Sequence, residues 1–474
     1  MDIHTKIVAT LGPATDSPDQ LAKMLRAGVD LIRVNFSHGT IDKHKQRVEA
    51  VRACAEKLGR QIGILVDLQG PKIRIAKFAE GSIALEPGMP FTIDTQLAPM
   101  GGTQTQVGTE YPHLAQDVNI GDKLLLDDGR IVLRVRRING SRIETEVQVG
   151  GKLSDHKGIN LKGGGLSAGA ITRKDRKDIK YAAQFGADYV AISFPGCADD
   201  IDEARKLLER AGGSAGIIAK IERAEAVEKI DAIIQAADGV MVARGDLAVE
   251  IGDAEVPAIQ KRIIRRAREM NKPVITATQM MESMISSTIP TRAEVSDVAN
   301  AILDGTDAVM LSAETAVGDH PAKVVAAVSR VCRAVERQPV MRRSRHRIDH
   351  RFERVDEVIA MAAMYTANHM RIKAIAAISA SGTTPLWMSR IRTGIPIYGL
   401  SDQSTALGKM TLYRNVFPIS LQLTQLSPGD IRTRVITELR HRKLVQSGDH
   451  VILTKGDHPG VHGGTNIMKI VRVA

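Results

Sequence analysis

Cysteine is scarce in this sequence of 474 residues, which has only Cys54, Cys197 and Cys332. These residues are far apart and form no CxxC pair, which argues against a zinc site or a disulfide framework and fits a reducing cytoplasm. No stretch of 18 apolar residues occurs, so we expect no membrane span and no membrane partner. Residues 1–10 lack the layout of a signal peptide, and a cytoplasmic location is therefore expected.

Aromatic residues are also scarce, at 3% of the chain, although the formal net charge is +11. A basic chain can bind nucleic acid, but so few aromatic side chains leave little surface for base stacking. We therefore expect no nucleic-acid partner and attribute the positive charge to small anionic substrates. Nine arginines and three acids lie in the segment 330–354, which we interpret as a solvated linker or a subunit surface.

Short apolar runs recur along the chain, and each is followed by a helical pattern. Such runs are typical of buried parallel strands, and eight of them favour a (β/α)8 TIM barrel over an open sheet. The predicted strands are 6–10, 31–36, 62–67, 189–194, 216–221, 239–243, 273–278 and 308–312. One helix start is well marked, because Thr291 and Glu294 form a capping box before an apolar pattern.

The barrel pattern is interrupted once, between the third and fourth strands. In that interval two apolar runs, 124–126 and 131–135, flank an Asp-Gly turn and predict a β-hairpin. We therefore predict an α/β protein with an insertion in its barrel and a third domain after it. The predicted parts are 1–70 (barrel), 71–163 (inserted β-barrel lid domain), 164–342 (barrel) and 343–474 (C-terminal α/β regulatory domain).

Polar and charged residues gather at the carboxyl ends of the predicted strands, where barrel enzymes carry their chemistry. For any one of them, a buried ion-pair network that closes the barrel mouth is the alternative. That alternative does not account for the whole set, because so many buried polar groups are costly without a ligand. The set comprises Arg33, Asn35, Ser37, His38, Asp67, Lys220, Glu222, Arg244, Gly245, Asp246, Thr278, Gln279, Ser312 and Glu314.

Glu222 and Asp246 end neighbouring predicted strands and offer hard oxygen ligands. Two carboxylates completed by substrate oxygens and water are the usual arrangement for Mg2+, with Mn2+ as an alternative. Gly245 lets the backbone come close to a ligand. Arg33 and Lys220 beside such a metal suit a phosphoryl or carboxylate group, so the set favours phosphoryl transfer.

Several other motifs are missing. The sequence has no GxxxxGK[ST] loop and no GxSxG elbow. Residues 163–168 match the GxGxxG/A pattern, but no apolar strand precedes them, so we reject a dinucleotide site there. His38 is interpreted as a hydrogen-bonded structural histidine more readily than as a catalytic base.

The strand ends carry long motifs that resemble those of pyruvate kinase, in the family's order and over essentially the whole chain. They are 33–39 (RVNFSHG), Asp67 with 70–74 (GPKIR), 219–222 (AKIE), 241–247 (MVARGDL) and 277–280 (ATQM). The resemblance implies transfer of the phosphoryl group of phosphoenolpyruvate to ADP, giving pyruvate and ATP in the last step of glycolysis. It also implies a homotetramer.

The resemblance further implies a role for each residue of the set. Arg33 holds the substrate phosphate, Lys220 neutralises the phosphoryl group in transfer, and Thr278 belongs to the relay that protonates the enolate. Glu222 and Asp246 bind the divalent metal. The implied substrate-binding residues are Arg33, Lys220, Arg244, Gly245, Asp246 and Thr278. The implied nucleotide contacts are Arg74, Lys157, His38 and Asn35, and the inserted domain, which carries Lys157, closes as a lid in the family.

Many family members need K+, which is held by groups equivalent to Asn35, Ser37, Asp67 and the carbonyl of Leu68. Lys72 stands where those members have glutamate. Because Gly70-Pro71 restrains the chain at the exit of the third strand, we expect the Lys72 ammonium close to Asp67, in place of the ion. The pattern resembles that of members that do not require K+. The alternative is that Lys72 points to solvent and the ion site remains.

A second site is predicted in the C-terminal domain, in the polar loop after the predicted strand 375–378. Hydroxyls and backbone N–H groups there form an anion nest, although an ordinary polar turn is the alternative. In the family this loop binds a phosphorylated effector, a sugar phosphate or AMP. The loop residues are Ser379, Ser381, Gly382, Thr383 and Thr384.

Two rival functions stay open at this point. A Mg-dependent barrel aldolase acting on pyruvate enolates uses the same carboxylates and an arginine, but needs neither an inserted domain nor ADP. A basic RNA-binding protein needs exposed aromatic residues and no carboxylate pair. Formation of ATP from phosphoenolpyruvate and ADP separates the three.

Overall fold

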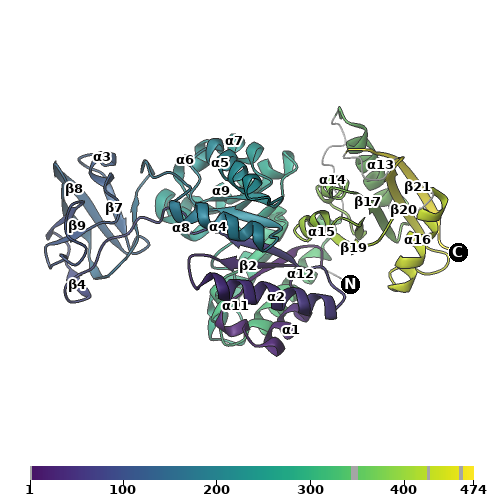
Figure 1. Cartoon of the computed structure of the whole chain (residues 1–474), viewed down its shortest axis with the longest axis horizontal. Coiled ribbons are helices and arrows are strands. Elements are labelled where there is room, and N and C mark those ends of the chain that lie inside the picture. The colour runs from purple at the N-terminus through teal and green to yellow at the C-terminus, as the bar shows by residue number, and fades with distance from the viewer. Residues whose placement is uncertain (1–2, 343–350, 424–427, 458–462) are drawn as a thin grey trace.

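The computed structural model describes residues 3–342, 351–423, 428–457 and 463–474. Figure 1 shows three bodies in a row, with a small β domain at one end, a barrel in the middle and an α/β domain at the other end. The centre of the arginine-rich segment and the predicted start of the C-terminal domain fall in residues 343–350, outside the described residues. Among the described residues, no helix has the length and apolar character needed to cross a membrane.

The central body is a closed barrel of eight parallel strands in the order β1-β16-β15-β14-β13-β12-β3-β2. This confirms the predicted (β/α)8 fold, and each strand lies within two residues of its predicted bounds. The strands are β1 Lys6–Thr10, β2 Leu31–Asn35, β3 Gly63–Asp67, β12 Tyr189–Ile192, β13 Gly216–Ile221, β14 Gly239–Ala243, β15 Val274–Ala277 and β16 Ala308–Leu311.

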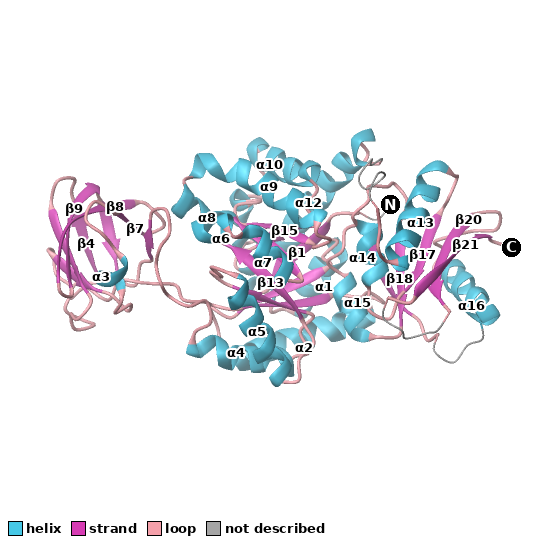
Figure 2. Ribbon diagram, turned by 90° about the horizontal axis from the view of Figure 1, so that it is seen from above, coloured by secondary structure: helices cyan, strands magenta, loops and turns pink. Residues whose placement is uncertain are grey.

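Helices cover the outside of the barrel (Figure 2). They are α1 Pro18–Ala27, α2 Ile41–Lys57, α4 Arg173–Gln184, α5 Ala198–Arg210, α6 Ala224–Glu228, α7 Ile230–Ala236, α8 Arg244–Ile251, α9 Val256–Glu269, α10 Arg292–Asp304, α11 Ala313–Ala316 and α12 Pro321–Glu336. Short 3-10 turns lie at η1 Pro13–Thr15, η2 Asp253–Glu255, η3 Glu282–Ile285 and η4 Pro339–Met341. The predicted capping box is confirmed at α10, where Thr291 and Glu294 bind each other's backbone N–H groups.

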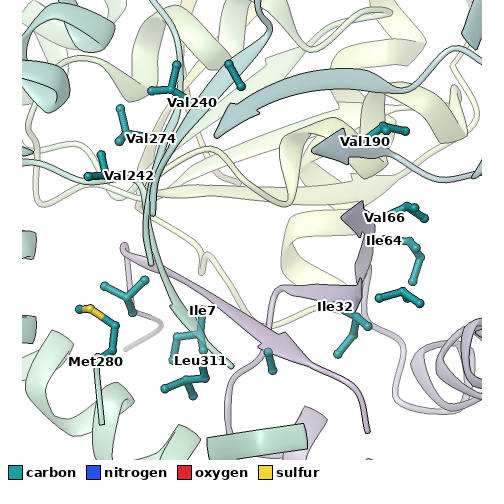
Figure 3. Close-up of a cluster of buried hydrophobic side chains, with 14 of the residues drawn as sticks. Ile7, Ile32, Ile64, Val66, Val190, Val240, Val242, Val274, Met280 and Leu311 are labelled. Carbon is teal, nitrogen blue, oxygen red and sulfur yellow. The ribbon is translucent and has the colours of Figure 1, made fainter. Parts of the chain in front are cut away.

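Successive residues of each strand alternate between two cores. Ile32, Ile64 and Val66 belong to the cluster that the strands form with the surrounding helices, part of which is drawn in Figure 3. Leu31 and Leu65 belong to the other cluster, inside the barrel. Because side chains alternate along a strand, residues two positions beyond this second set point into the barrel mouth.

The inserted domain, between β3 and α4, has its own hydrophobic core. The predicted hairpin is confirmed, because β7 and β8 pair antiparallel across the turn at Asp127, Asp128 and Gly129. All three of these residues have positive φ, and they reverse the chain within the loop between Leu126 and Ile131. The elements are β4 Ser82–Leu85, β5 Pro90–Asp94, β6 Gln106–Gly108, α3 Leu114–Asp117, β7 Lys123–Leu126, β8 Ile131–Asn139, β9 Arg142–Val149, β10 Gly151–Ser154 and β11 Ile159–Leu161.

The C-terminal domain is a five-stranded sheet of order β19-β18-β17-β20-β21, with β21 antiparallel at one edge. Its elements are α13 Val355–His369, β17 Ala374–Ile378, α14 Thr383–Ser389, β18 Ile397–Ser401, α15 Ser404–Met410, β19 Val416–Ser420, α16 Pro428–His441, β20 His450–Gly456 and β21 Thr465–Arg472. The domain contacts the amino-terminal end of the barrel strands through Arg390, which forms an ion pair with Asp307 where both side chains are 1% exposed. The barrel mouth, at the opposite end of the strands, stays free of it.

Candidate active site

A chain of ion pairs crosses the barrel mouth. The guanidinium of Arg33 on β2 lies 2.7 Å from the carboxylate of Asp67, the last residue of β3. The other Asp67 oxygen lies 3.4 Å from the ammonium of Lys220 on β13, and that ammonium lies 2.9 Å from Glu222. Parallel strands ending at one edge bring these residues together. Arg33 and Lys220 keep 11% and 12% of their side chains exposed, so both cations reach the opening.

The charges of these ion-paired residues favour binding of a further cation beside Glu222 and Asp246. Burial alone raises the pKa of Asp67, but the charges of Lys220 and Arg33 outweigh it and lower the pKa overall. Burial lowers the pKa of Lys220, but Asp67 and Glu222 outweigh it and raise the pKa. Burial raises the pKa of Glu222 to about 7, and the charge of Asp246 adds to that rise. Glu222 and Asp246 therefore repel each other and gain from a metal between them.

Asp246 lies in the first turn of α8, directly after β14. The Lys72 ammonium lies 3.3 Å from Asp246 and 3.8 Å from Asp128 in the hairpin of the inserted domain. Among the described residues it forms no ion pair with Asp67, so its direct partners are acids other than the one expected from the sequence. The chain turns away from β3 at Gly70, whose φ is +68°, and carries Lys72 across to α8.

The donor set fits a divalent cation such as Mg2+. Glu222 is 1% exposed, whereas 29% of the Asp246 side chain reaches the opening. Within the described ranges, no three His, Cys, Asp or Glu side chains come together as a ready-made metal cage. Mg2+ is commonly held by one or two carboxylates and completed by substrate oxygens and water, so an open two-carboxylate site suits it.

The ends of β14 and β15 form a second wall of the site. The Thr278 hydroxyl accepts a hydrogen bond from the Gly245 N–H at 2.9 Å and donates one to the carbonyl of Ala277. Thr278 has φ +66°, an uncommon conformation for a β-branched residue and one that concentrates at functional sites. A Cβ on Gly245 would lie no closer than 3.7 Å to its neighbours, so the fold itself does not demand glycine there. The Arg244 guanidinium points away, to Asp297 at 2.7 Å.

Two site residues escape the sequence analysis. The Thr10 hydroxyl at the end of β1 accepts a hydrogen bond from Arg33 at 3.1 Å. The Ser193 hydroxyl, just after β12, accepts one from Lys220 at 2.7 Å and donates one to the Leu68 carbonyl at 2.7 Å. Both lie at the carboxyl ends of predicted strands, 6–10 and 189–194, so including the ends of strands one and four in the candidate set would have found them.

The residues equivalent to a monovalent-cation site lie at the carboxyl ends of β2 and β3 and just after them. The Leu68 carbonyl is engaged by Ser193, and the Asn35 side-chain oxygen accepts the Ser37 N–H at 3.1 Å. Ser37 itself is exposed. The Asp67 carboxylate is shared between Arg33 and Lys220. Of these oxygens, those of Asp67 are therefore already paired with two cations of the protein itself.

Of the residues suggested for nucleotide binding, Asn35 is aligned with Asp67 on the neighbouring strand, whereas Arg74 and Lys157 lie in the inserted domain. Arg74 donates to the His156 carbonyl at 2.7 Å, and Lys157 forms an ion pair with Asp127 at 2.7 Å, both within the inserted domain. His38 is exposed in the loop after β2. No hydrogen bond or ion pair links Arg74 or Lys157 to the barrel residues of the site in the part of the chain that the structure describes.

The polar loop of the C-terminal domain lies far from the barrel mouth. The Ser379 hydroxyl accepts the Gly382 N–H at 3.0 Å, and the hydroxyls of Ser381 and Thr383 lie 2.8 Å apart. Thr384 bonds to Thr465 across the end of the sheet. Gly382 has φ +81°, which favours glycine. The loop and Lys455 both line a cavity of about 50 Å³.

Comparisons with known proteins agree over the whole chain. A family model described as pyruvate kinase, barrel domain, matches residues 3–325, and one described as pyruvate kinase, alpha/beta domain, matches residues 357–471. The chain is 52% identical to pyruvate kinase II of Salmonella typhimurium over 99% of this chain and 98% of that protein. It is 52% identical to a pyruvate kinase of Haemophilus influenzae over 96% and 95% of the two chains. It is 40% identical to one of Mycobacterium tuberculosis over 99% and 98%.

Proposed function

Because the chain belongs to the pyruvate kinase family, we propose that it transfers the phosphoryl group of phosphoenolpyruvate to ADP and releases pyruvate and ATP. The observation that carries this assignment is the Lys220 ammonium. It is held between two buried carboxylates, beside Arg33 and the pair Glu222 and Asp246, at the open end of a barrel. A cation fixed in place before the reaction stabilises charge that develops on a group in transfer.

The reaction breaks the bond between phosphorus and the enol oxygen and forms one to a terminal oxygen of ADP. Arg33 binds the phosphate of phosphoenolpyruvate, and Asp67 and Thr10 fix the orientation of its guanidinium. Lys220 faces the three equatorial oxygens of the phosphoryl group, where charge is spread in the transition state. Ser193, Asp67 and Glu222 hold its ammonium there, so little reorganisation is needed during transfer.

The enolate left behind takes a proton on carbon to become pyruvate. Glu222 and Asp246 would hold the divalent metal, which when bound would neutralise the charge of the phosphate. The Gly245 N–H and the Thr278 hydroxyl face the substrate carboxylate, and the strained Thr278 belongs to the proton relay. Arg74, Lys157, His38 and Asn35 bind the nucleotide when the inserted domain closes over the mouth and excludes water.

An assay for ATP from phosphoenolpyruvate, ADP and Mg2+ tests the proposal. We expect ATP and pyruvate in equal amounts, and neither when ADP is left out. A barrel aldolase on pyruvate enolates is the rival, and it would release pyruvate from an aldol substrate without ADP. Such ADP-independent activity, together with no ATP in the first assay, would refute the kinase assignment.

A regulatory site and a homotetramer are also part of the proposal. The hydroxyls around Gly382 and the small cavity beside Lys455 support binding of a phosphorylated effector, a sugar phosphate or AMP. For assembly, the exposed face of α13 carries Val355, Val358 and Tyr365, each 46% exposed or more, next to the edge strand β21. Apolar patches and unpaired strand edges of this kind are typical of subunit contacts.

A further inference from the structure

Helix α8, which carries Asp246, contacts both connections between the inserted domain and the barrel. On the outgoing connection, Lys72 forms an ion pair with Asp246. On the returning connection, the Gly163 N–H donates to the Glu250 carbonyl at 3.0 Å, and the Asn160 side chain donates to the Glu250 carboxylate at 3.4 Å. The position of the inserted domain is therefore tied to the helix that presents a predicted metal ligand.

The Glu250 carboxylate also contacts the segment that directly follows the other predicted metal ligand. Its second oxygen accepts the N–H of Ala224 at 2.9 Å, and Ala224 follows Glu222 by two residues. Glu250 is 5% exposed, and burial raises the pKa of its carboxyl to about 7. Among the described residues it forms no ion pair. A buried acid held by N–H groups alone is costly, so its place at this junction calls for a role.

The returning connection is shaped to lie against this junction. Gly163, Gly164 and Gly165 have φ between +82° and +106°, a conformation that other residues rarely adopt. The Gly165 N–H donates to the Glu225 carboxylate, and a Cβ on Gly164 would overlap that carboxylate. The glycine run that resembles a dinucleotide motif is therefore a turn held against Glu225 and Glu250.

We propose that Glu250 is a positioning residue, whose carboxylate couples the returning connection of the inserted domain, through Asn160, to the peptide that follows Glu222. The contact to Asn160, at 3.4 Å, is long for a hydrogen bond and shortens when the inserted domain closes, as hydrogen bonds at active sites commonly do. Closure then fixes the backbone that follows Glu222. The group that fixes it, Glu250, lies on α8, the helix that carries the other metal ligand, Asp246. This inference rests on the proposed function and deepens it.

The test exchanges hydrogen-bonding roles between two side chains. In Glu250→Gln the amide oxygen still accepts the Ala224 N–H, but the amide nitrogen faces the Asn160 donor. In Asn160→Asp a second carboxylate faces Glu250. The double variant Glu250→Gln with Asn160→Asp restores a donor opposite an acceptor, and Glu255→Gln, an exposed acid beyond α8, is the matched control. The readouts are kcat, KM, Mn2+ affinity by electron paramagnetic resonance, and amide hydrogen exchange of residues 159–165 and 222–226.

We expect kcat and kcat/KM of each single variant to fall together by about tenfold, the equivalent of one hydrogen bond in the closed state. Mn2+ should bind more weakly and both segments should exchange faster, and the double variant should recover most of each loss. Single variants that match the control in every readout, or a double variant no better than either single one, would overturn the proposal. If the wild type forms no ATP, the proposed function fails, while exchange and Mn2+ affinity still decide the role of Glu250.

Discussion

Lys72 is the residue whose charge bears most directly on the ion requirement of the site. Its ammonium lies between Asp246 and Asp128, so it contacts a predicted metal ligand and the inserted domain together. This lysine adds a fixed positive charge to the acids on both sides of it.

We therefore predict full activity in tetramethylammonium buffer without K+, with less than about twofold stimulation when K+ is added. Lys72→Glu should lose activity in that buffer and recover part of it with K+, because the acids of the site again lack a monovalent cation. Steady-state turnover of both proteins with and without K+ is the measurement. Strong K+ stimulation of the wild type would show that Lys72 does not substitute for the ion.

The metal ligands give a second prediction for single residues. Glu222→Gln or Asp246→Asn should raise the Mg2+ concentration for half-maximal activity by about tenfold or more, because each removes charge from a hard-cation site. Titration of activity with Mg2+ checks this, with Glu255→Gln as the control. Titrations of both variants that superimpose on that of the wild type would reject the ligand assignment.

Sequence reasoning located charged site residues better than neutral ones. Arg33, Asp67 and Lys220 stand out because a charge at the end of an apolar strand needs a partner. Ser193 is short and uncharged, and its contacts with Lys220 and the Leu68 carbonyl depend on how neighbouring strands are aligned. The placement of Lys72 depends on the turn at Gly70, which the spacing of residues does not specify.

At the scale of secondary-structure elements, the starts of β3 and β12 are joined by a buried acid, Asp188, whose pKa is raised. The Asp188 carboxylate, just before β12, accepts the Ile64 N–H at 2.7 Å and lies against Gly408 of α15, where a Cβ would overlap it. Burial raises the pKa of Asp188 from its usual 3.8 to about 6. The folded protein therefore binds this proton more tightly than the unfolded chain does.

The folded protein is therefore favoured while Asp188 is protonated. As the pH rises from about 4 to 6 this contribution is lost, and the free energy of unfolding falls. The full effect is about 3 kcal/mol, from about 1.4 kcal/mol for each pKa unit. Asp188→Asn should lack this loss, so its melting temperature relative to the wild type should be higher at pH 7 than at pH 4.5. Thermal unfolding at both pH values is the measurement, with the exposed Asp199→Asn as the control. An equal pH dependence of wild type and Asp188→Asn would contradict the assignment.

The barrel strands were predictable because each is a buried apolar run followed by a helix. In the inserted domain only the hairpin of β7 and β8 and the alternating strand β9 carry a clear signal. Strands β6 and β11 have three residues each; β6 pairs parallel with the preceding strand β5, and β11 pairs with β7, beyond three intervening strands. Their place is set by the shared core, which no local pattern describes.

At the scale of the whole molecule, the C-terminal domain can influence the site only through the barrel. Helix α14 begins in the polar loop at Thr383 and ends next to Arg390, which forms the buried ion pair with Asp307. Asp307 also accepts the Val274 N–H at the start of β15, the strand that ends before Thr278. One short helix therefore connects the proposed effector loop to a strand of the active site.

We predict that Ser381→Asp or Thr383→Asp abolishes activation by a phosphorylated effector, because the added carboxylate repels its phosphate. Turnover at saturating phosphoenolpyruvate should persist, since the loop lies in another domain. The lost coupling should correspond to about 1–3 kcal/mol in apparent substrate affinity. Substrate curves with and without sugar phosphates or AMP check this. A wild type whose curve no such compound shifts would make the loop an ordinary turn.

The most direct test of the account is the rate of ATP formation from phosphoenolpyruvate and ADP by the wild type and by Lys220→Met. Circular dichroism should accompany it, because the substitution leaves Asp67 and Glu222 without their shared cation and lowers stability. We predict rapid ATP formation by the wild type and a loss of about 10²–10³ or more in the folded variant. A folded Lys220→Met protein with over about half of the wild-type turnover would contradict the central claim that this lysine stabilises the phosphoryl group in transfer.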